Sequence, residues 1–152
     1  MDRVRVGFIG AGRISTLHAL AYERNPTGDL VAVADSNPGA AKQQADKWGA
    51  KLVFSDYREM LQSPDIDAVE VLLPHNLHLQ VSREALEAGK HVSLQKPMCL
   101  TMSEAMQIVD AAHAASSVFR MVENYRTYEP YMTCEPRRCW IQVRLASQLV
   151  CG

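Results

Sequence analysis

The sequence predicts an α/β fold with a doubly wound parallel sheet in the strand order 3-2-1-4-5-6. Two observations carry this prediction. Short apolar runs alternate with amphipathic helical patterns six times along most of the chain. A glycine-rich turn of the form G-x-G-x-x-S joins the first apolar run to the first helical pattern. Such alternation favours right-handed crossovers and a sheet covered by helices on both faces.

The bulk composition is that of an ordinary globular chain. The 152 residues are 47% hydrophobic and 22% charged, with a formal net charge of −1. This near-neutral charge argues against nucleic acid or an anionic membrane surface as the main partner. No apolar run reaches the roughly 18 residues of a membrane-spanning helix, and the N-terminus does not read as a signal peptide. We therefore expect one cytoplasmic domain with a full hydrophobic core.

The four cysteines do not form a metal-binding pattern. Cys99 stands alone, Cys134, Cys139 and Cys151 lie near the C-terminus, and no histidine follows His113. No two cysteines form a C-x-x-C pair. We interpret the cysteines as free thiols and expect no zinc site.

The first strand, the turn and the start of the first helix lie in residues 4–15, VRVGFIGAGRIS. One glycine lets the chain change direction, and a second lets a phosphate approach the backbone beside the free N–H groups of the helix. Ser15 stands where Gly or Ala is usual, and it is small enough for close packing of helix and strand. The helix shows an apolar stripe at Ile14, Leu17, Ala21 and Tyr22.

The later strands follow from short apolar runs bounded by turn residues. They are predicted at residues 30–34, 52–54, 68–73, 91–94 and 118–122. The helices between them carry start and stop signals. Asn37 with Pro38 and Ser55 are predicted N-caps, Gly49 is a predicted stop, and Thr101 with Glu104 forms a capping box.

Ligands of such a sheet bind outside the carboxyl ends of the strands, where the strand order reverses between the first and fourth strands. The candidate residues are therefore those that directly follow the strands. They are Gly10, Gly12, Arg13, Ile14, Asp35, Ser36, Pro74, Asn76, His78, Gln95, Lys96 and Asn124. His18 and His113 fall in helices, where we expect them at the core edge or in solvent.

Asp35 stands at close to the usual spacing from the glycine turn for a carboxylate that binds an adenosine ribose. A carboxylate there repels a 2′-phosphate, which favours NAD over NADP. Alternatively, Asp35 only caps the next turn. Arg13 either approaches the pyrophosphate or is a solvated residue at the helix start.

Lys96 and two histidines are the candidates for contact with the reacting groups. His75 and His78 follow the fourth strand, where an imidazole could bond a ribose hydroxyl or a substrate oxygen, or serve the structure alone. Lys96 follows the fifth strand between Gln95 and Pro97. Its ammonium group could hold a substrate hydroxyl beside the nicotinamide and take part in proton transfer. The alternative is an exposed lysine before a turn proline.

Several ordered motifs resemble the N-terminal half of the Gfo/Idh/MocA oxidoreductases over about residues 3–130. They are GFIGAGRIS, ADSNP, PHNLH, ALEAGKHV, QKPMCLT and ENYR. The resemblance implies a Rossmann domain that binds NAD or NADP. It also implies hydride transfer at a carbon bearing a hydroxyl group, usually in a sugar, polyol or cyclitol.

The same resemblance assigns roles by position. Lys96 resembles the catalytic lysine of the family's Glu-Lys-Pro motif, whose proline typically follows a cis peptide bond. Pro74, Asn76 and His78 resemble the loop beside the nicotinamide ribose. Asn124 resembles the asparagine that ends the sixth strand near the cofactor.

The sequence departs from the family pattern at two of these positions. Gln95 replaces the usual glutamate, so any contact that used a carboxylate becomes a weaker neutral one, although Gln95 could still bond the cofactor. Leu73 replaces a common threonine and removes a hydroxyl group.

The resemblance implies a second domain that supplies the substrate pocket, and we expect this domain to be absent from this sequence. We predict a dinucleotide-binding domain over residues 1–127 and an atypical tail over residues 128–152, which suggests a truncated or frame-shifted reading of a longer gene. We expect the chain alone to bind NAD weakly, to be inactive and to self-associate through exposed apolar surface. The alternative function is a non-catalytic dinucleotide-binding or regulatory module.

Overall fold

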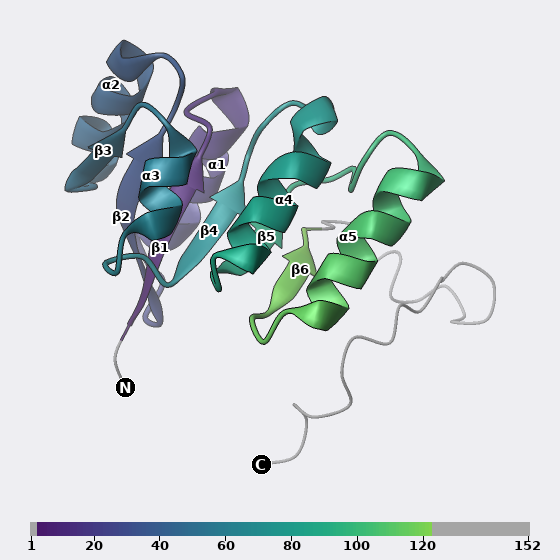
Figure 1. Ribbon diagram of the computed structural model, residues 1–152. Coiled ribbons are helices and arrows are strands. Elements are labelled where there is room, and N and C mark those ends of the chain that lie inside the picture. Colours follow the sequence, from purple (N-terminus) through teal and green to yellow (C-terminus); the bar gives the residue numbers. More distant parts are fainter. Residues whose placement is uncertain (1–2, 123–152) are drawn as a thin grey trace, which may run out of the picture. The chain divides into compact units, whose positions relative to one another are not determined.

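The computed structural model describes residues 3–122 (Figure 1). They form a six-stranded sheet in the order β3-β2-β1-β4-β5-β6, and every neighbouring pair of strands is parallel. The predicted fold class and strand order are thus confirmed. The strands are β1 (Val4–Ile9), β2 (Gly28–Ala34), β3 (Leu52–Phe54), β4 (Ala68–Val71), β5 (His91–Leu94) and β6 (Phe119–Met121).

Helices cover both faces of the sheet. They are α1 (Arg13–Tyr22), α2 (Pro38–Trp48), α3 (Tyr57–Gln62), α4 (His78–Glu87) and α5 (Met102–Ala114), and a short 3₁₀ turn, η1 (His75–Leu77), precedes α4. Figure 1 shows α3, α4 and α5 in front of the sheet and α1 behind it. Within residues 3–122, no helix is long and apolar enough to cross a membrane.

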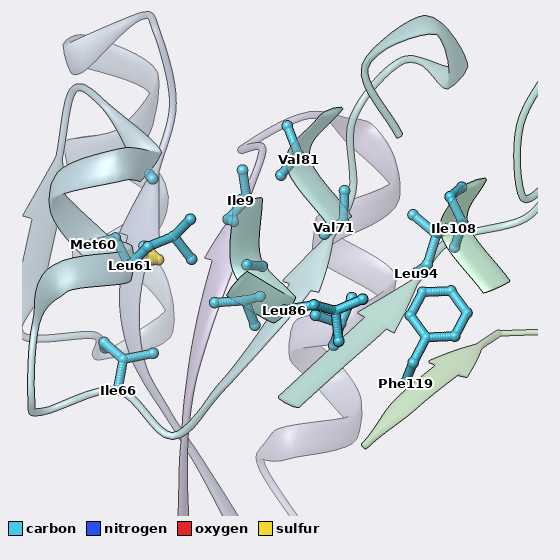
Figure 2. Packing of buried hydrophobic residues seen from close by; sticks show 14 of the residues in the cluster. Ile9, Met60, Leu61, Ile66, Val71, Val81, Leu86, Leu94, Ile108 and Phe119 are labelled. Atoms are coloured by element: carbon cyan, nitrogen blue, oxygen red, sulfur yellow. The ribbon is translucent and has the colours of Figure 1, made fainter. Parts of the chain in front are cut away.

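The larger core cluster lies between the sheet and α3, α4 and α5. Figure 2 shows Val71, Leu94 and Phe119 from the strands close to Ile108 of α5 and Leu86 of α4. On the opposite face, Phe8 is fully buried. Its ring meets Tyr22 and Trp48 edge to face, with centroids 5.6 and 5.7 Å away. Each face of the sheet therefore has a core of its own.

Most of the predicted helix signals are found. The Asn37 side chain accepts hydrogen bonds from the backbone N–H groups of Gly39 and Ala40, and Thr101 and Glu104 form a reciprocal capping box. Gly49 ends α2 in the left-handed conformation. The predicted Ser55 cap is wrong. Asp56 caps α3 instead, because its carboxylate accepts from the backbone N–H of Arg58.

The helix α1 is confirmed, but of its predicted apolar stripe only Tyr22 packs against the core, where it contacts Phe8, and the other three residues are exposed. The buried residues of α1 are Ser15 and Ala19. Leu17 is 64% exposed, and Ile14 is exposed as well. The buried residues are small because α1 must lie close to the sheet, as the third position of the glycine motif requires. The apolar spacing marked the helix but not the face that it buries.

Strand ends also differ from the prediction by one or two residues. β4 ends at Val71 rather than at residue 73. Pro74 lacks an N–H group and restricts the residue before it, so the chain leaves the sheet early. The predicted domain boundary at residues 127 and 128, the tail and Asn124 lie outside the described residues.

Arg5 of β1 is tied to Asp67, which directly precedes β4, at the amino-terminal edge of the sheet. The guanidinium of Arg5 donates to both carboxylate oxygens of Asp67, at 3.0 and 2.6 Å, and the backbone N–H of Arg5 donates to the same side chain at 2.8 Å. These hydrogen bonds lower the pKa of Asp67 to about 2. The ionised form of Asp67 therefore stabilises the folded state.

The Phe8→Ala variant is expected to lose about 3–5 kcal/mol of unfolding free energy, because it leaves a cavity between two aromatic rings. Leu17→Ala on α1 is the control, and it should change stability by less than about 1 kcal/mol because Leu17 is exposed. Urea unfolding followed by circular dichroism measures both. Equal losses in the two variants would contradict the aromatic core on this face.

Acid should weaken the fold through Asp67. Its folded pKa of about 2 lies below its ordinary value of 3.8, so its contribution is complete above about pH 4 and is lost as pH falls to 2. Urea unfolding midpoints measured across this window should fall more steeply in the natural chain than in Asp67→Asn. If the unfolding midpoints of the two proteins fell equally with pH, the contact of Asp67 with Arg5 would not stabilise the fold.

Candidate functional site

The predicted site residues that the structure describes follow the carboxyl ends of the strands. Backbone hydrogen bonds continue one residue past the strands there. The N–H of Gly10 donates to the carbonyl of Ala34 at 2.8 Å, that of Leu72 to Ile9 at 2.9 Å and that of Gln95 to Val71 at 3.1 Å. The turns after β1, β4 and β5 are thereby held in register with the neighbouring strands. The residues that follow each turn start from fixed backbone positions.

The two glycines of the first turn have different roles. Gly10 has φ +109°, and a Cβ there would lie 2.6 Å from the carbonyl oxygen of Leu72. No L side chain fits this position, so Gly10 is required by the fold. A Cβ on Gly12 would meet nothing within 4 Å. Gly12 instead leaves open space in front of α1.

The N-terminus of α1 faces this open space without a cap of its own. Gly12 is the N-cap residue and offers no side chain, and the first turn of the helix contains no acidic residue. The N-terminal N–H groups and the positive end of the helix dipole are therefore available to an anion. Arg13 and Ile14 begin the helix and are exposed.

Asp35 connects this turn to the end of β2. One carboxylate oxygen accepts from the backbone N–H of Ala11 at 2.8 Å, and the other accepts from that of Asn37 at 2.8 Å. The predicted turn-capping role is therefore present. Each carboxylate oxygen can still accept a second hydrogen bond. Ser36 lies beside it and is exposed, and contact of either residue with a ribose stays a prediction.

The loop after β4 contains both exposed and buried candidates. Pro74, His75 and Asn76 are exposed, whereas His78 is completely buried. The Nε2 atom of His78 lies 2.9 Å from the carbonyl oxygen of Leu73. Its Nδ1 atom lies 2.9 Å from the carbonyl oxygen of Pro97 and 3.2 Å from that of Met98. His78 thus braces the loop after β4 against the loop after β5.

This arrangement favours the structural interpretation of His78. Both ring nitrogens already lie against backbone carbonyl groups, so a ribose or substrate contact would displace one of them. His75 packs edge-on against the His78 ring, with centroids 5.4 Å apart. Exposure leaves His75 and Asn76, rather than His78, open to a ligand.

Lys96 is exposed at the end of β5, and the Lys96–Pro97 peptide bond is cis. The Lys96 side chain is therefore accessible to solvent. Gln95 is buried, and both ends of its amide group are engaged within the protein. Its Oε1 accepts from the backbone N–H of Lys96 at 2.7 Å, and its Nε2 lies 2.9 Å from Nε2 of His18.

The contact from Gln95 leads to His18, which was expected at the core edge or in solvent, and through it to Glu70, which sequence reasoning missed. His18 lies beside Glu70 of β4, which also accepts a hydrogen bond from Tyr22. The available signal was a charged residue inside an otherwise apolar strand, AVEVLL. Within residues 3–122, no group of three His, Cys, Asp or Glu side chains could hold a metal ion.

The comparisons with known proteins agree with this geometry. Residues 4–123 match the family described as an oxidoreductase family with an NAD-binding Rossmann fold. The chain belongs to the Gfo/Idh/MocA family. A relative is the levoglucosan dehydrogenase of Pseudarthrobacter phenanthrenivorans, 33% identical over 83% of this chain and 34% of its own length. The chain thus spans about a third of the curated relatives that it matches.

Solved structures show the same fold. A levoglucosan dehydrogenase in complex with NADH has a TM-score of 0.78 at 32% identity, covering 82% of this chain and 36% of that one. A scyllo-inositol dehydrogenase of Lactobacillus casei with bound NAD(H) and scyllo-inositol has a TM-score of 0.74 at 29% identity, covering 79% and 36%. The Rossmann domain of the Gfo/Idh/MocA family is therefore the part of the protein that the structure describes.

The two glycines of the turn should respond differently to alanine. Gly10→Ala is expected to destabilise the fold by more than about 2 kcal/mol, because its Cβ would collide with the Leu72 carbonyl at a positive φ. Gly12→Ala has room for its Cβ and should cost no more than about 1 kcal/mol. Thermal or urea unfolding of both variants measures the difference. A larger loss in Gly12→Ala would contradict the roles assigned here.

Proposed function

We propose that this chain is the NAD-binding part of an oxidoreductase that transfers hydride between the nicotinamide and a hydroxyl-bearing carbon of a sugar, polyol or cyclitol. The observation that carries the proposal is the open space at Gly12 in front of the uncapped N-terminus of α1. A diphosphate group fits this place, because the helix offers N–H donors and positive potential there. The NADH and NAD(H) complexes of the similar structures support the same cofactor.

Different residues of the chain would bind different parts of this cofactor. The turn residues Gly10 and Gly12 and the first turn of α1 would hold the pyrophosphate, with Arg13 exposed beside them. Asp35 would accept hydrogen bonds from the adenosine ribose with the lone pairs that Ala11 and Asn37 leave free. Its negative charge opposes a 2′-phosphate, so NAD is favoured over NADP.

Lys96 is the residue that we assign to the substrate. NAD supplies the hydride acceptor when it is bound. The Lys96 ammonium group, exposed at the end of β5, would hold the substrate hydroxyl and take part in moving its proton. The exposed Pro74 and Asn76 would lie beside the nicotinamide ribose. The sugar and cyclitol dehydrogenases among the relatives support this substrate class.

Calorimetric titration tests the cofactor. The chain should bind NAD more tightly than NADP. Asp35→Ala should weaken NAD by about tenfold or more and NADP less, because loss of the turn contacts to Ala11 and Asn37 acts on both dinucleotides while loss of the ribose hydrogen bond acts on NAD alone. Gly12→Ala should abolish binding of both dinucleotides in a folded protein. Asp46→Ala, on the exposed surface of α2, is the matched control and should change neither affinity.

Two results would count against this assignment. If the natural chain bound neither NAD nor NADP, the assignment of a dinucleotide cofactor would be wrong. Equal losses of NAD and NADP affinity in Asp35→Ala would contradict the ribose contact while leaving the pyrophosphate site in place.

A further inference from the structure

A chain of hydrogen bonds leads from the middle of β4 to the peptide group of Lys96. Tyr22 donates its hydroxyl to one oxygen of Glu70 at 2.8 Å, and Nδ1 of His18 lies 2.7 Å from the other oxygen. Nε2 of His18 lies 2.9 Å from Nε2 of Gln95. Oε1 of Gln95 accepts from the backbone N–H of Lys96 at 2.7 Å. The proposed cofactor contacts use none of these side-chain groups.

The groups at the two ends of this series of hydrogen bonds determine which atom donates and which accepts at each step. Glu70, as a carboxylate, only accepts hydrogen bonds, so Nδ1 of His18 must carry a proton. The backbone N–H of Lys96 only donates, so it requires the oxygen of the Gln95 amide. The NH₂ group of Gln95 then faces Nε2 of His18 as a donor. Nε2 must therefore be the bare, accepting nitrogen of a neutral imidazole.

Burial of these side chains makes an unpaired hydrogen-bond donor among them unfavourable. The side chains of His18 and Glu70 are 15% and 12% exposed, and Gln95 is 7% exposed. A buried donor without an acceptor costs more than an exposed one, because water cannot replace the lost partner. Burial and the nearby Glu70 carboxylate raise the pKa of Tyr22, so its hydroxyl keeps its proton and donates.

We infer that Glu70, His18 and Gln95 form a positioning relay that fixes the Lys96 peptide, and that Gln95 holds His18 in the neutral form protonated at Nδ1. The role of Lys96 in catalysis rests on the proposed function, but the relay does not. His18, Glu70 and Gln95 are positioning residues, since they act on the crevice through the backbone of Lys96.

The residue at position 95 decides the protonation of His18. A second proton on His18 would set an Nε2–H group against the NH₂ group of Gln95. Rotating the Gln95 amide by half a turn would instead set its NH₂ group against the backbone N–H of Lys96, so two donors would still face each other. Glutamate at this position would accept from both sides. In Gln95→Glu, His18 would therefore lie between two carboxylates and would take up the second proton.

Nitrogen-15 NMR of the imidazole rings tests this relay at pH 7 with no dinucleotide present. In the natural chain, His18 should show a protonated Nδ1 and a bare Nε2, and in Gln95→Glu it should show two protonated nitrogens. His18→Phe assigns the signals. Gln107→Glu, which adds the same charge at an exposed position of α5, is the matched control and should leave the His18 signals unchanged.

Hydrogen exchange of the Lys96 amide tests the positioning itself. Gln95→Ala should speed this exchange by about tenfold relative to the natural chain, because the amide loses its acceptor. Three results would each overturn the relay. They are a protonated Nε2 of His18 in the natural chain, an unprotonated Nε2 of His18 in Gln95→Glu, and an unchanged exchange rate of the Lys96 amide in Gln95→Ala. The imidazole signals of the natural chain still decide the question if a variant does not fold. A failed NAD titration would overturn the proposed function and leave the relay intact.

Discussion

The close approach of Gly10 to the carbonyl group of Leu72 is the contact on which the site depends. It brings the turn after β1 against the turn after β4, at the point where the strand order of the sheet reverses. An open crevice exists at such a reversal because the helices that follow the two strands leave on opposite faces.

The two faces of the sheet differ in chemistry, and the site uses the difference. The side facing α3, α4 and α5 has the larger apolar cluster, which packs against Val71 of β4 and Leu94 of β5 at the ends of these strands (Figure 2). The side facing α1 mixes Phe8 with Glu70. Glu70 is acceptable there because Tyr22 and His18 satisfy its oxygens. A polar contact can therefore run from inside the sheet to Lys96.

The sequence predicted the parts of this structure that depend on local patterns. Strand order followed from the alternation of apolar runs with helices, and caps such as Asn37 followed from side chains that bond their own neighbours. The buried face of α1 could not be predicted in this way, because helix spacing in the apolar residues does not say which face the sheet will cover. Leu17 has the right spacing and is exposed, whereas Ser15 is buried.

The candidate residues that follow the strands also differ in how many hydrogen-bond donors and acceptors remain free for a ligand. Asp35 uses both oxygens inside the protein but keeps further lone pairs, so it can brace the turn and bind a ribose together. His78 contacts the carbonyl group of Pro97 in the loop after β5, and Gln95 contacts His18 of α1, and both partners are distant in sequence. Such pairings depend on the folded arrangement, and no spacing along the chain reveals them. Their burial favours a role in holding the crevice, and we propose that the more accessible Gly12, Asp35, Asn76 and Lys96 contact the ligands.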